Sequence, residues 1–402
     1  MPATAPISSL DLLDERALEN PYPVYEAMRS MGPAVYLERH GVWAIPRYDE
    51  VRSVLAAADI FRAEGERVLT PLAGAILPFD GEQHARMRQV LAHRLRPSAV
   101  ARLQRQLADR ARRLVLEHCV DGGFDAVALS RAMAAGAVMD LMGLAENLRV
   151  PVLEAITTAC AATDVLGPPA ERAMLAVLNG AVTRGSVRRG SWMETIFQAV
   201  DAGKICDDEA IPLAVAYATA GIESTVLGLA GAIVQLARHP EHWCRLRVEP
   251  ACAEAAFHEA VRRDAPIQGL GRLVTESVTL DGVQLRASER VWLLIGSAGR
   301  DPRKWGLTAD TFDMRRPGAD KHLSLGAGSH ACPGGHLTLM QARTLLRALA
   351  DHCTTLSPAS TPSRSQTHVL RGFTTALITI TTPRWRAQAH RASPTSPSES
   401  PR

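Results

Sequence analysis

The chain has 402 residues, 47% of them hydrophobic and 22% charged, so it is long enough and apolar enough to bury a large core. This composition excludes a fibrous or fully disordered protein. Its 45 Lys and Arg residues nearly balance 42 Asp and Glu residues, and the net charge of +3 does not favour a nucleic-acid partner. Aromatic residues are scarce at 4%, so Ala, Leu and Val must fill the core, which favours helices.

The cysteines and the N-terminal sequence indicate in which cellular compartment the protein is found. The cysteines are odd in number and form no C-x-x-C pair, which argues against a disulfide framework and a thiolate zinc site; they are Cys119, Cys160, Cys206, Cys244, Cys252, Cys332 and Cys353. The N-terminus lacks a charged segment followed by an apolar one, so no signal peptide or membrane anchor is predicted. We therefore expect a cytoplasmic protein without a membrane partner.

The first half of the chain is predicted to be mainly helical after a loose lead-in over 1–15. Strand-like runs over 34–37 and 42–46 flank His40-Gly41 and predict a hairpin. Apolar residues recur at three- and four-residue spacing in the expected helices, which span 24–30, 49–57, 82–94, 99–119, 125–142 and 150–163. Segments rich in Gly, Pro and Ser predict loops near 166–169 and 185–191.

Residues 210–237 contain no Lys or Arg and are apolar at nearly every turn, which predicts one long helix buried on all sides. A transmembrane span is the alternative. Pro212, three glycines and the acidic Glu223 in the middle count against that alternative, because an acid at bilayer depth is costly.

The C-terminal part of the chain is predicted to mix helices, strands and irregular segments. We expect a helix over 249–264, strands over 274–295 with a turn at Asp281-Gly282, irregular chain over 301–328, a helix over 334–352 and a terminal hairpin over 369–381. Without an internal linker, 16–384 is expected to form one domain, mainly α with small β-sheets. The Ser- and Pro-rich tail over 385–402 is expected to be disordered.

The segment LGAGSHACPGG, Leu325 to Gly335, carries the sharpest chemical signal. Cys332 lies between a glycine-rich turn and a helix start, where backbone N–H groups and the helix dipole stabilise a thiolate. Gly326 and Gly328 allow a tight turn and a close approach to a flat ligand. An isolated buried cysteine is the alternative interpretation, but this setting is suited to an axial thiolate for haem iron.

The segment resembles the haem-binding loop of the cytochrome P450 family, whose Gly, His, Cys and Gly positions match Gly328, His330, Cys332 and Gly334. The resemblance extends over nearly the whole chain and implies the P450 fold, with a long central helix over the haem and Cys332 as the iron ligand. Leu325, Gly326, His330 and Gly334 would then contact the cofactor. Leu325 replaces the usual Phe of this loop, and Pro333 has no N–H to offer the sulfur.

Three further motifs match the family. Glu259 and Arg262 match its E-x-x-R helix, where an i, i+3 pair can form an ion pair, and the resemblance makes Arg316 the third member, with Arg315 as the alternative. By the same resemblance the haem propionates are expected to bind His84 and Arg88, one turn apart on a helix, together with Arg272 and His330. A surface histidine and a surface salt bridge are the ordinary alternatives for these residue types.

The long helix contains Ala220-Gly221-Ile222-Glu223-Ser224-Thr225, which resembles the family's A-G-x-[DE]-T-[TS] segment. Gly221 is expected to thin the helix so that dioxygen can lie beside it, and an acid and an alcohol can deliver protons there. Glu223 is therefore a candidate catalytic residue. Ser224 stands where Thr is usual, so Thr225 is expected to share the hydroxyl role. A hydroxyl bonded back to the helix carbonyls is the alternative.

The resemblance implies a bacterial-type monooxygenase with haem b, O2 as co-substrate and NAD(P)H used only indirectly. With no reductase motif, electrons are expected from a ferredoxin or flavodoxin with its reductase, docking on basic residues such as Arg86, Arg94, Arg96 and Lys321. The protein is expected to be monomeric. A peroxygenase or oxidative coupling enzyme, and a non-catalytic haem sensor, are the alternatives.

The substrate pocket is predicted to be lined by 72–77, 213–220, 267–273 and one of Leu293 and Leu294. Its polar exceptions are Tyr217, Thr219, Gln268 and Arg272. We therefore expect a small, neutral and largely apolar substrate, oxidised in catabolism or secondary metabolism, with a mobile lid near 166–190.

Overall fold

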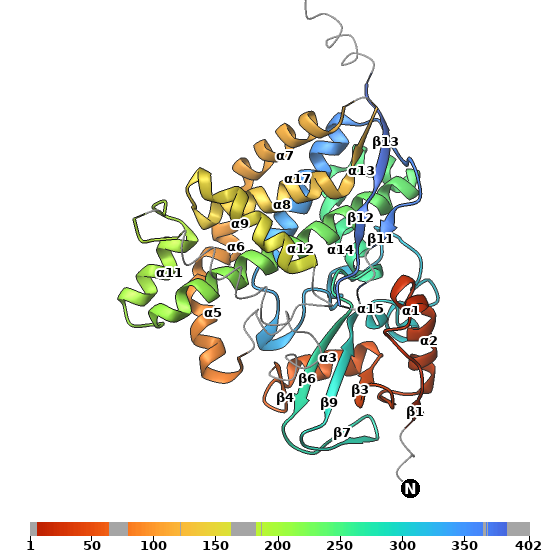
Figure 1. Cartoon of the computed structure of the whole chain (residues 1–402). Helices are drawn as coiled ribbons and strands as arrows, with labels where there is room; N and C mark the ends of the chain where they lie inside the picture. The colour runs from red at the N-terminus through yellow and green to blue at the C-terminus, as the bar shows by residue number, and fades with distance from the viewer. Residues whose placement is uncertain are drawn as a thin grey trace, which may run out of the picture.

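The computed structural model describes residues 6–63, 79–120, 122–161, 182–185, 187–364, 367 and 369–383, and the following statements concern these residues. The chain is built from a large helical part and a smaller part in which short N-terminal helices pack on a β-sheet (Figure 1). Helices prevail as the composition predicts.

The β part is organised around a six-stranded mixed sheet. Its order is β1 (Ile7–Ser8), β2 (Val35–Leu37), β3 (Val42–Ile45), β9 (Arg290–Leu294), β6 (Gly269–Val274) and β4 (Phe61–Arg62). The β2–β3 hairpin lies where the sequence predicts it. The predicted loose lead-in is wrong from Ile7 onward, because Ile7 and Ser8 pair in parallel with β2.

Short helices cover this sheet. They are α1 (Glu15–Glu19), α2 (Tyr22–Met31), α3 (Tyr48–Ala56), α15 (Ile295–Ala298) and α16 (Pro302–Trp305). A separate hairpin joins β7 (Val278–Leu280) and β8 (Val283–Leu285). Its turn residues Asp281 and Gly282 have φ of 43° and 84°, which is the backbone that a two-residue hairpin turn requires.

The helical part comprises α5 (Gly81–Leu95), α6 (Pro97–Ala101), α7 (Gln104–His118), α8 (Ala126–Met142), α9 (Glu146–Ala161), α11 (Trp192–Asp201), α12 (Asp207–Arg238), α13 (Pro240–Val248), α14 (Ala253–Arg263) and α17 (Gly335–His352). The single helix predicted over 99–119 is wrong: the chain breaks between α6 and α7. There Leu103 N–H bonds to the carbonyl of Val100, three residues back, which ends α6 in a tight turn.

Helix α12 is the central helix of the fold, and its N-terminus is capped by Glu209, whose carboxylate accepts the backbone N–H of Cys206 at 2.8 Å. Within the described residues it is also the one helix long and apolar enough to cross a membrane. However, 72% of its most apolar window is buried inside the protein. Its apolar length is therefore accounted for by core packing.

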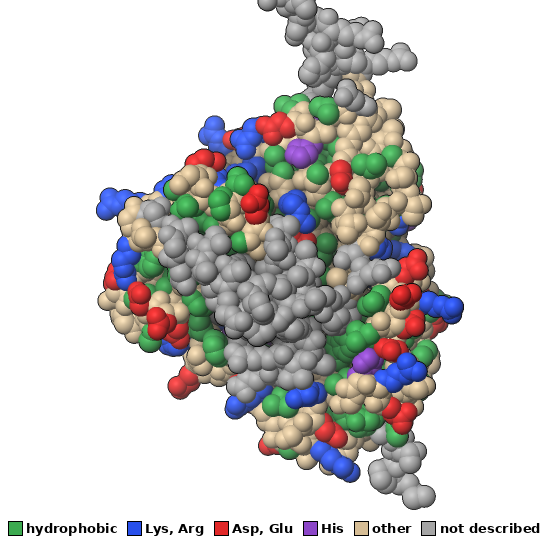
Figure 2. Space-filling model, in the orientation of Figure 1, with side chains coloured by type: hydrophobic (Ala, Val, Ile, Leu, Met, Phe, Trp, Pro, Cys, Tyr) green, Lys and Arg blue, Asp and Glu red, His purple; other side chains and the backbone are tan. Residues whose placement is uncertain are grey.

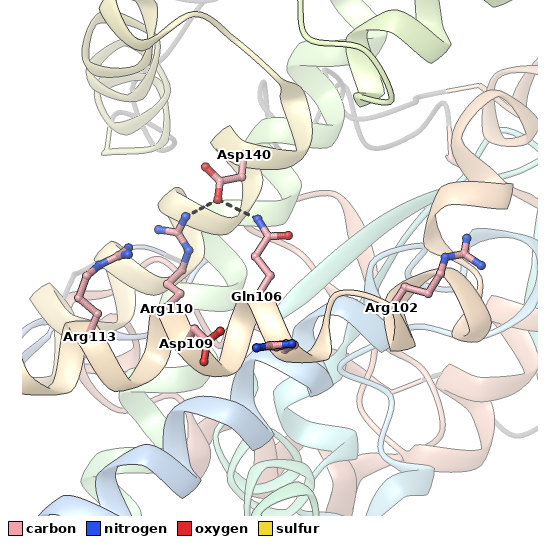
Figure 3. Close-up of a pocket in the computed structure, with 7 residues that line it drawn as sticks. Arg102, Gln106, Asp109, Arg110, Arg113 and Asp140 are labelled. Atoms are coloured by element: carbon pink, nitrogen blue, oxygen red, sulfur yellow. Dashed lines mark hydrogen bonds and ion pairs between the residues drawn. The ribbon is translucent and has the colours of Figure 1, made fainter.

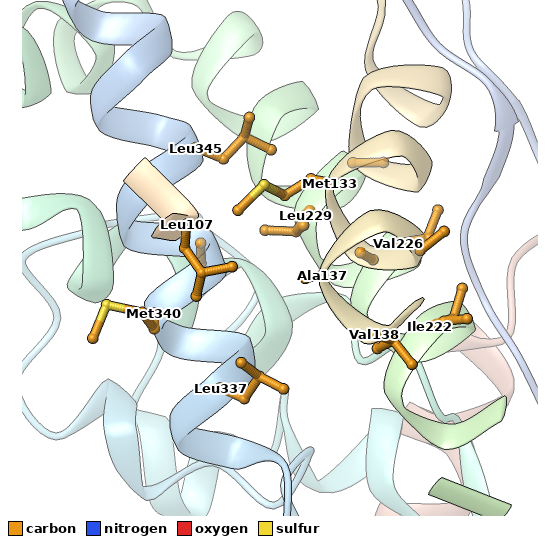
Figure 4. Close-up of a cluster of buried hydrophobic side chains, with 14 of the residues drawn as sticks. Leu107, Met133, Ala137, Val138, Ile222, Val226, Leu229, Leu337, Met340 and Leu345 are labelled. Atoms are coloured by element: carbon orange, nitrogen blue, oxygen red, sulfur yellow. The ribbon is translucent and has the colours of Figure 1, made fainter. Parts of the chain in front are cut away.

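The main core lies where α7, α8, α12 and α17 meet (Figure 4). Leu107 of α7, Met133 of α8, Leu229 of α12 and Leu345 of α17 converge there, and all are at most 3% exposed. Because these helices come from distant parts of the sequence, this core holds the middle of α12 against the first turns of α17.

The C-terminal hairpin predicted over 369–381 is wrong in its pairing. Strand β12 (Phe373–Thr375) pairs with β11 (Ser363–Arg364), whereas β13 (Leu377–Thr381) pairs with β10 (Thr355–Pro358) and β5 (Gly123–Asp125). Both β12 and β13 are strands, as predicted, but they pair with strands elsewhere in the chain and not with each other. A local sequence pattern does not show which strands will pair.

Candidate functional site

The cysteine loop connects a short 3₁₀ turn, Gly328–His330, to α17. Gly326 and Gly328 adopt left-handed backbone, with φ of 71° and 67°. A Cβ at position 328 would overlap the carbonyl oxygen of Leu55 at the end of α3. The loop is closed by the Cys332 N–H, which donates to the Leu325 carbonyl at 2.7 Å. These two glycines are therefore required by conformation and, at 328, by close packing as well.

Cys332 combines an accessible side chain with a largely protein-filled environment. The residue is exposed, but the surrounding atoms desolvate its sulfur, and this burial raises the pKa of the thiol. The backbone N–H groups of Gly334 and Gly335 and the guanidinium of Arg88 act in the opposite direction. Cys332 is thus an accessible sulfur with two N–H donors and one cation near it, which suits a metal-bound thiolate.

Beside the cysteine, the four residues predicted to bind propionates come together. The imidazoles of His84 and His330 are stacked, with ring centroids 4.0 Å apart and planes at 22°. Arg88 donates to the Ala331 carbonyl at 2.7 Å, and the charges of both Arg88 and Arg272 act on His330. The four residues come from α5, β6 and the cysteine loop.

The protonation of this group is set mainly by burial. Burial lowers the pKa of His84 to about 4, with further lowering by His330 and Arg88. Burial also lowers the pKa of His330. At neutral pH both imidazoles are therefore neutral, and the two cations Arg88 and Arg272 match the charge of the two carboxylates of haem.

Asp80 belongs to the same group, and the sequence reasoning missed it. Its Oδ1 lies 2.8 Å from Nε2 of His330, and its Oδ2 accepts the N–H of Ala63 at 2.7 Å. Asp80 therefore orients the His330 ring. The available signal was its place immediately before α5, four residues ahead of His84, where an acidic residue favours a helix start.

On the central helix α12, Glu223 forms an ion pair with Arg131 of α8. The two nitrogens of Arg131 lie 2.9 and 3.1 Å from the two oxygens of Glu223. Glu223 keeps 16% of its side chain exposed and Arg131 keeps 30%. The sequence analysis did not identify Arg131, although it is the only basic residue of α8.

The two hydroxyls next to Glu223 have different surroundings. Ser224 donates to the Ala220 carbonyl one turn back, at 2.9 Å. Thr225 is 1% exposed, and its hydroxyl lies 3.2 Å from that of Thr338 on α17. Thr225 thus connects α12 to the helix that begins beside Cys332, whereas Ser224 shares the half-buried stretch of α12 with Glu223.

Gly221 contacts helix α8 in the structure, whereas the sequence analysis expected it to leave space for dioxygen. A Cβ at this position would lie 3.2 Å from a methyl group of Val138 on α8. The missing side chain therefore lets α8 approach α12 closely, so the interpretation that it makes room for dioxygen is not supported. The residues of the central stretch that are only half-buried are Ala220, Gly221, Glu223 and Ser224.

The E-x-x-R residues form a fully buried network. Glu259 and Arg262 are both 0% exposed, with Arg262 Nε 2.7 Å from Glu259 Oε2. Arg316 is the third member, with its Nε 3.0 Å from Glu259 Oε1, whereas Arg315 bonds to Asp313. Arg262 also donates to the carbonyls of Gly299, Ala309 and Thr311.

The four polar residues expected in the pocket fall into two pairs. Gln268 accepts from Tyr25 and donates to the Ala265 carbonyl, and Arg272 donates to the Gly271 carbonyl. In contrast, the buried hydroxyls of Tyr217 and Thr219 find no partner within the described ranges. The predicted lining over 72–77 and most of the predicted lid over 166–190 lie outside the described residues.

Two of the basic residues expected to dock a redox partner are engaged within the chain. Arg86 makes two 2.7 Å hydrogen bonds to Glu209, and Arg94 donates to Thr195 at 3.0 Å. Arg96 and Lys321 are exposed. On the face shown in Figure 2, basic and acidic side chains are interspersed, without a region of one sign.

A surface pocket of about 510 Å³ lies along α7 and α8 (Figure 3). It is lined by Arg102, Arg105, Gln106, Asp109, Arg110, Arg113 and Asp140, and Asp140 bonds to Arg110 and Gln106. None of the predicted site residues contributes to it. In the part of the chain described, no three His, Cys, Asp or Glu side chains are grouped to hold a metal ion. The single Cys332 is instead the donor that a haem iron with one protein ligand needs.

Comparison with known proteins agrees with this geometry. The family model for "Cytochrome P450" matches residues 193–378. Cytochrome P450 CYP199A2 of Rhodopseudomonas palustris is 33% identical over 382 residues, covering 90% of this chain and 91% of the relative. The monooxygenase PikC of Streptomyces venezuelae is 28% identical over 376 residues, covering 88% and 89%. The crystal structure of CalO2 superposes with a TM-score of 0.82 at 27% identity, covering 93% and 99%.

Proposed function

The chain belongs to the cytochrome P450 family and is a P450 monooxygenase that uses haem and O2, and we propose that its substrate is a small, largely apolar organic molecule. The proposed reaction is hydroxylation, epoxidation or dealkylation, in catabolism or secondary metabolism. Support for an apolar substrate comes from α12, whose residues over 213–220 are almost all aliphatic and buried.

We assign the haem contacts to residues that the fold brings together. Cys332 would bind the iron, and Arg88 and Arg272 with the neutral His84 and His330 would bind the two carboxylates. When bound, haem supplies the redox chemistry that activates dioxygen, and the protein supplies position and exclusion of water. Asp80 would accept the Nε2–H of His330 and so fix the orientation of this ring beside the carboxylates.

Proton delivery is assigned to Glu223 and Ser224. Glu223 is held by Arg131 and can exchange protons with solvent because both side chains are partly exposed. Ser224 donates to a helix carbonyl and can therefore accept a hydrogen bond while it passes on its own proton. Thr225 is assigned a positioning role, since its hydroxyl bonds to Thr338.

The Thr225–Thr338 contact is the observation that carries the proposal. It fixes the turn of α12 that contains Glu223 and Ser224 against the first turn and a half of α17, the helix that starts immediately after the cysteine loop. The helix that follows the thiol and the helix that carries the acid–alcohol pair are thus joined by one hydrogen bond. Such an arrangement serves an enzyme that binds dioxygen at a metal and protonates it.

Electrons would come from a ferredoxin or flavodoxin whose reductase draws on NAD(P)H, with Arg96 and Lys321 as the exposed basic residues available for docking. We also infer a cytoplasmic monomer in which 16–384 form one domain. The pairing of β13 with β5 supports the last point, because it joins the C-terminal strands to the N-terminal half.

The carbon monoxide complex of the reduced protein tests the proposal. Wild type should give the red-shifted Soret band of thiolate ligation, and Cys332→His should give the band of a histidine-ligated haem. Turnover of a substrate found by spin-state screening should then require ferredoxin, reductase and NADPH. Turnover with hydrogen peroxide but not with the electron-transfer proteins would establish a peroxygenase instead, and a wild-type band of histidine type would refute thiolate ligation.

A further inference from the structure

Tyr217 is the one aromatic residue of α12, and its hydroxyl is unsatisfied. The residue is 6% exposed, and its ring packs edge-on against Trp192 of α11, with centroids 6.2 Å apart. Around it α12 carries small or aliphatic side chains, including Leu213, Ala214 and Ala220. Within the described residues no donor or acceptor lies in hydrogen-bonding reach of the phenol oxygen.

The other buried tyrosines show how unusual this is. Tyr25 donates its hydroxyl to Gln268 Oε1 at 3.2 Å, and Tyr48 donates to the Lys321 carbonyl at 2.6 Å. A hydroxyl removed from water without a partner destabilises the folded protein, so buried polar groups are nearly always bonded. Because no described residue bonds to the phenol of Tyr217, we look for its partner in a bound ligand.

The location of the phenol indicates which site that partner occupies. Tyr217 lies seven residues before Ser224, so the two share one face of the helix. Burial raises the pKa of the phenol; the Arg88 guanidinium opposes this shift and Cys332 adds to it, so both groups act on the phenol electrostatically. Tyr217 thus lies on the Ser224 face of α12, within electrostatic reach of Cys332 and Arg88.

We propose that Tyr217 is a specificity-determining residue whose hydroxyl donates a hydrogen bond to an acceptor oxygen of the bound substrate. This inference rests on the proposed function and narrows its substrate class. The substrate is an apolar molecule that carries a carbonyl or ether oxygen, rather than a plain hydrocarbon. Because the oxygen is anchored on α12, the part of the substrate presented for oxidation is set by its distance from that oxygen.

The test compares wild type with Tyr217→Phe, which removes only the hydroxyl. Ligand binding is measured by the Soret shift for matched pairs that differ by one carbonyl oxygen: 2-adamantanone with adamantane, acetophenone with ethylbenzene, and 2-decanone with decane. For at least one ketone the variant should bind about five- to tenfold more weakly, as expected for one neutral hydrogen bond, while its hydrocarbon partner changes by less than about twofold. If no ketone binds more tightly to wild type than to the variant, the proposal is wrong.

Tyr25→Phe is the matched control, because it makes the same chemical change at a phenol that has a partner. Without ligand, Tyr217→Phe should unfold at the same temperature as wild type or higher, whereas Tyr25→Phe should unfold lower and keep the wild-type ketone affinity. A lower unfolding temperature for Tyr217→Phe would show that the hydroxyl is already bonded in the ligand-free protein and would contradict the proposal.

A haem carboxylate is the competing acceptor, and the rate of haem transfer to apomyoglobin separates it from substrate. Faster haem loss from Tyr217→Phe with unchanged ketone binding would overturn the proposal. The thiolate-type carbon monoxide spectrum is recorded for both proteins. If the proposed function is wrong, wild type lacks this spectrum. If only the inference about Tyr217 is wrong, the spectrum is present and the two proteins bind the ketones equally well.

Discussion

Two Arg–Glu pairs of the same chemistry occupy very different settings in this molecule. Arg262 and Glu259 are both 0% exposed, and Arg316 and several backbone groups also bond to them. Arg131 and Glu223 are 30% and 16% exposed, and two hydrogen bonds join them. Both pairs use two nitrogens and two oxygens, so geometry alone does not separate a structural pair from a functional one.

The difference lies in burial, because one pair is sealed from water and the other is partly exposed. Arg262 holds the carbonyls of Ala309 and Thr311, so it organises the irregular chain ahead of the cysteine loop. Opening that pair would leave charges and carbonyls unsatisfied in a dry interior. The Arg131–Glu223 pair can open into water at much lower cost, as the proton transfer proposed for Glu223 requires.

The largest expected effect is on folding, from Arg262→Met. The substitution leaves the Glu259 carboxylate buried without its closest cation, and breaking such a pair destabilises a protein by about 3–5 kcal/mol. Yield of soluble haem-containing protein and its thermal unfolding measure this effect. Arg315→Met, at an exposed neighbour of Arg316, serves as control and should behave like wild type. Equal stability of Arg262→Met and the control would remove the distinction between the two pairs.

Glu223→Gln should affect turnover rather than folding. A partly exposed pair contributes about 0–1 kcal/mol to stability, so the unfolding temperature should change little. Losing the acid should slow substrate oxidation about a hundredfold and increase the solvent deuterium isotope effect. Arg131→Gln keeps the acid and should retain most of the rate. The assignment fails if Glu223→Gln turns over like wild type.

The stability of the folded protein should fall at acidic pH because of two buried histidines, one on α14 and one packed against it. His322 lies 3.1 Å from His258, and burial lowers the pKa of His322 to about 3 from an ordinary 6.5, with His258 and Arg262 lowering it further. Burial also lowers the pKa of His258, which faces Glu254 and Asp320. The unfolded chain therefore takes up a proton before the folded one, and stability falls as the pH drops from about 6.5 towards 3.

Between pH 7 and 5, His322 alone should account for about 2 kcal/mol of this loss. Denaturant unfolding of wild type and His322→Gln at both values measures it. The variant should lose less stability on acidification, although it starts less stable at pH 7. Parallel losses in both proteins would show that His322 is not kept neutral by the fold.

The smallest effects should separate Ser224 from Thr225. Thr225→Val removes the hydrogen bond to Thr338 and should cost about 1 kcal/mol of stability. Ser224→Ala should leave stability unchanged and divert NADPH into hydrogen peroxide, because the hydroxyl that passes protons is gone. Peroxide formed per NADPH consumed is the measurement. The reverse pattern would make Thr225 the working hydroxyl.

Much of the site could be predicted from sequence because its residues lie in short motifs. Cys332 with its glycines, the one-turn spacing of His84 and Arg88, and the acid in an apolar helix are local patterns. Asp80, Arg131 and Thr338 were not predicted, since each acquires its role from a partner at least 92 positions away in the chain.

The sequence by itself determined the mainly helical fold class, the long apolar helix and the cysteine loop. Hydrophobic periodicity and glycine-dependent turns are properties of neighbouring residues. Tertiary structure decided which strands pair, that Gly221 faces Val138, and that no described residue bonds to the Tyr217 hydroxyl. These properties depend on which surfaces meet after folding. Whether a hydroxyl has a hydrogen-bond partner depends on the groups that folding brings near it, and the spacing of residues along the chain does not directly specify those groups.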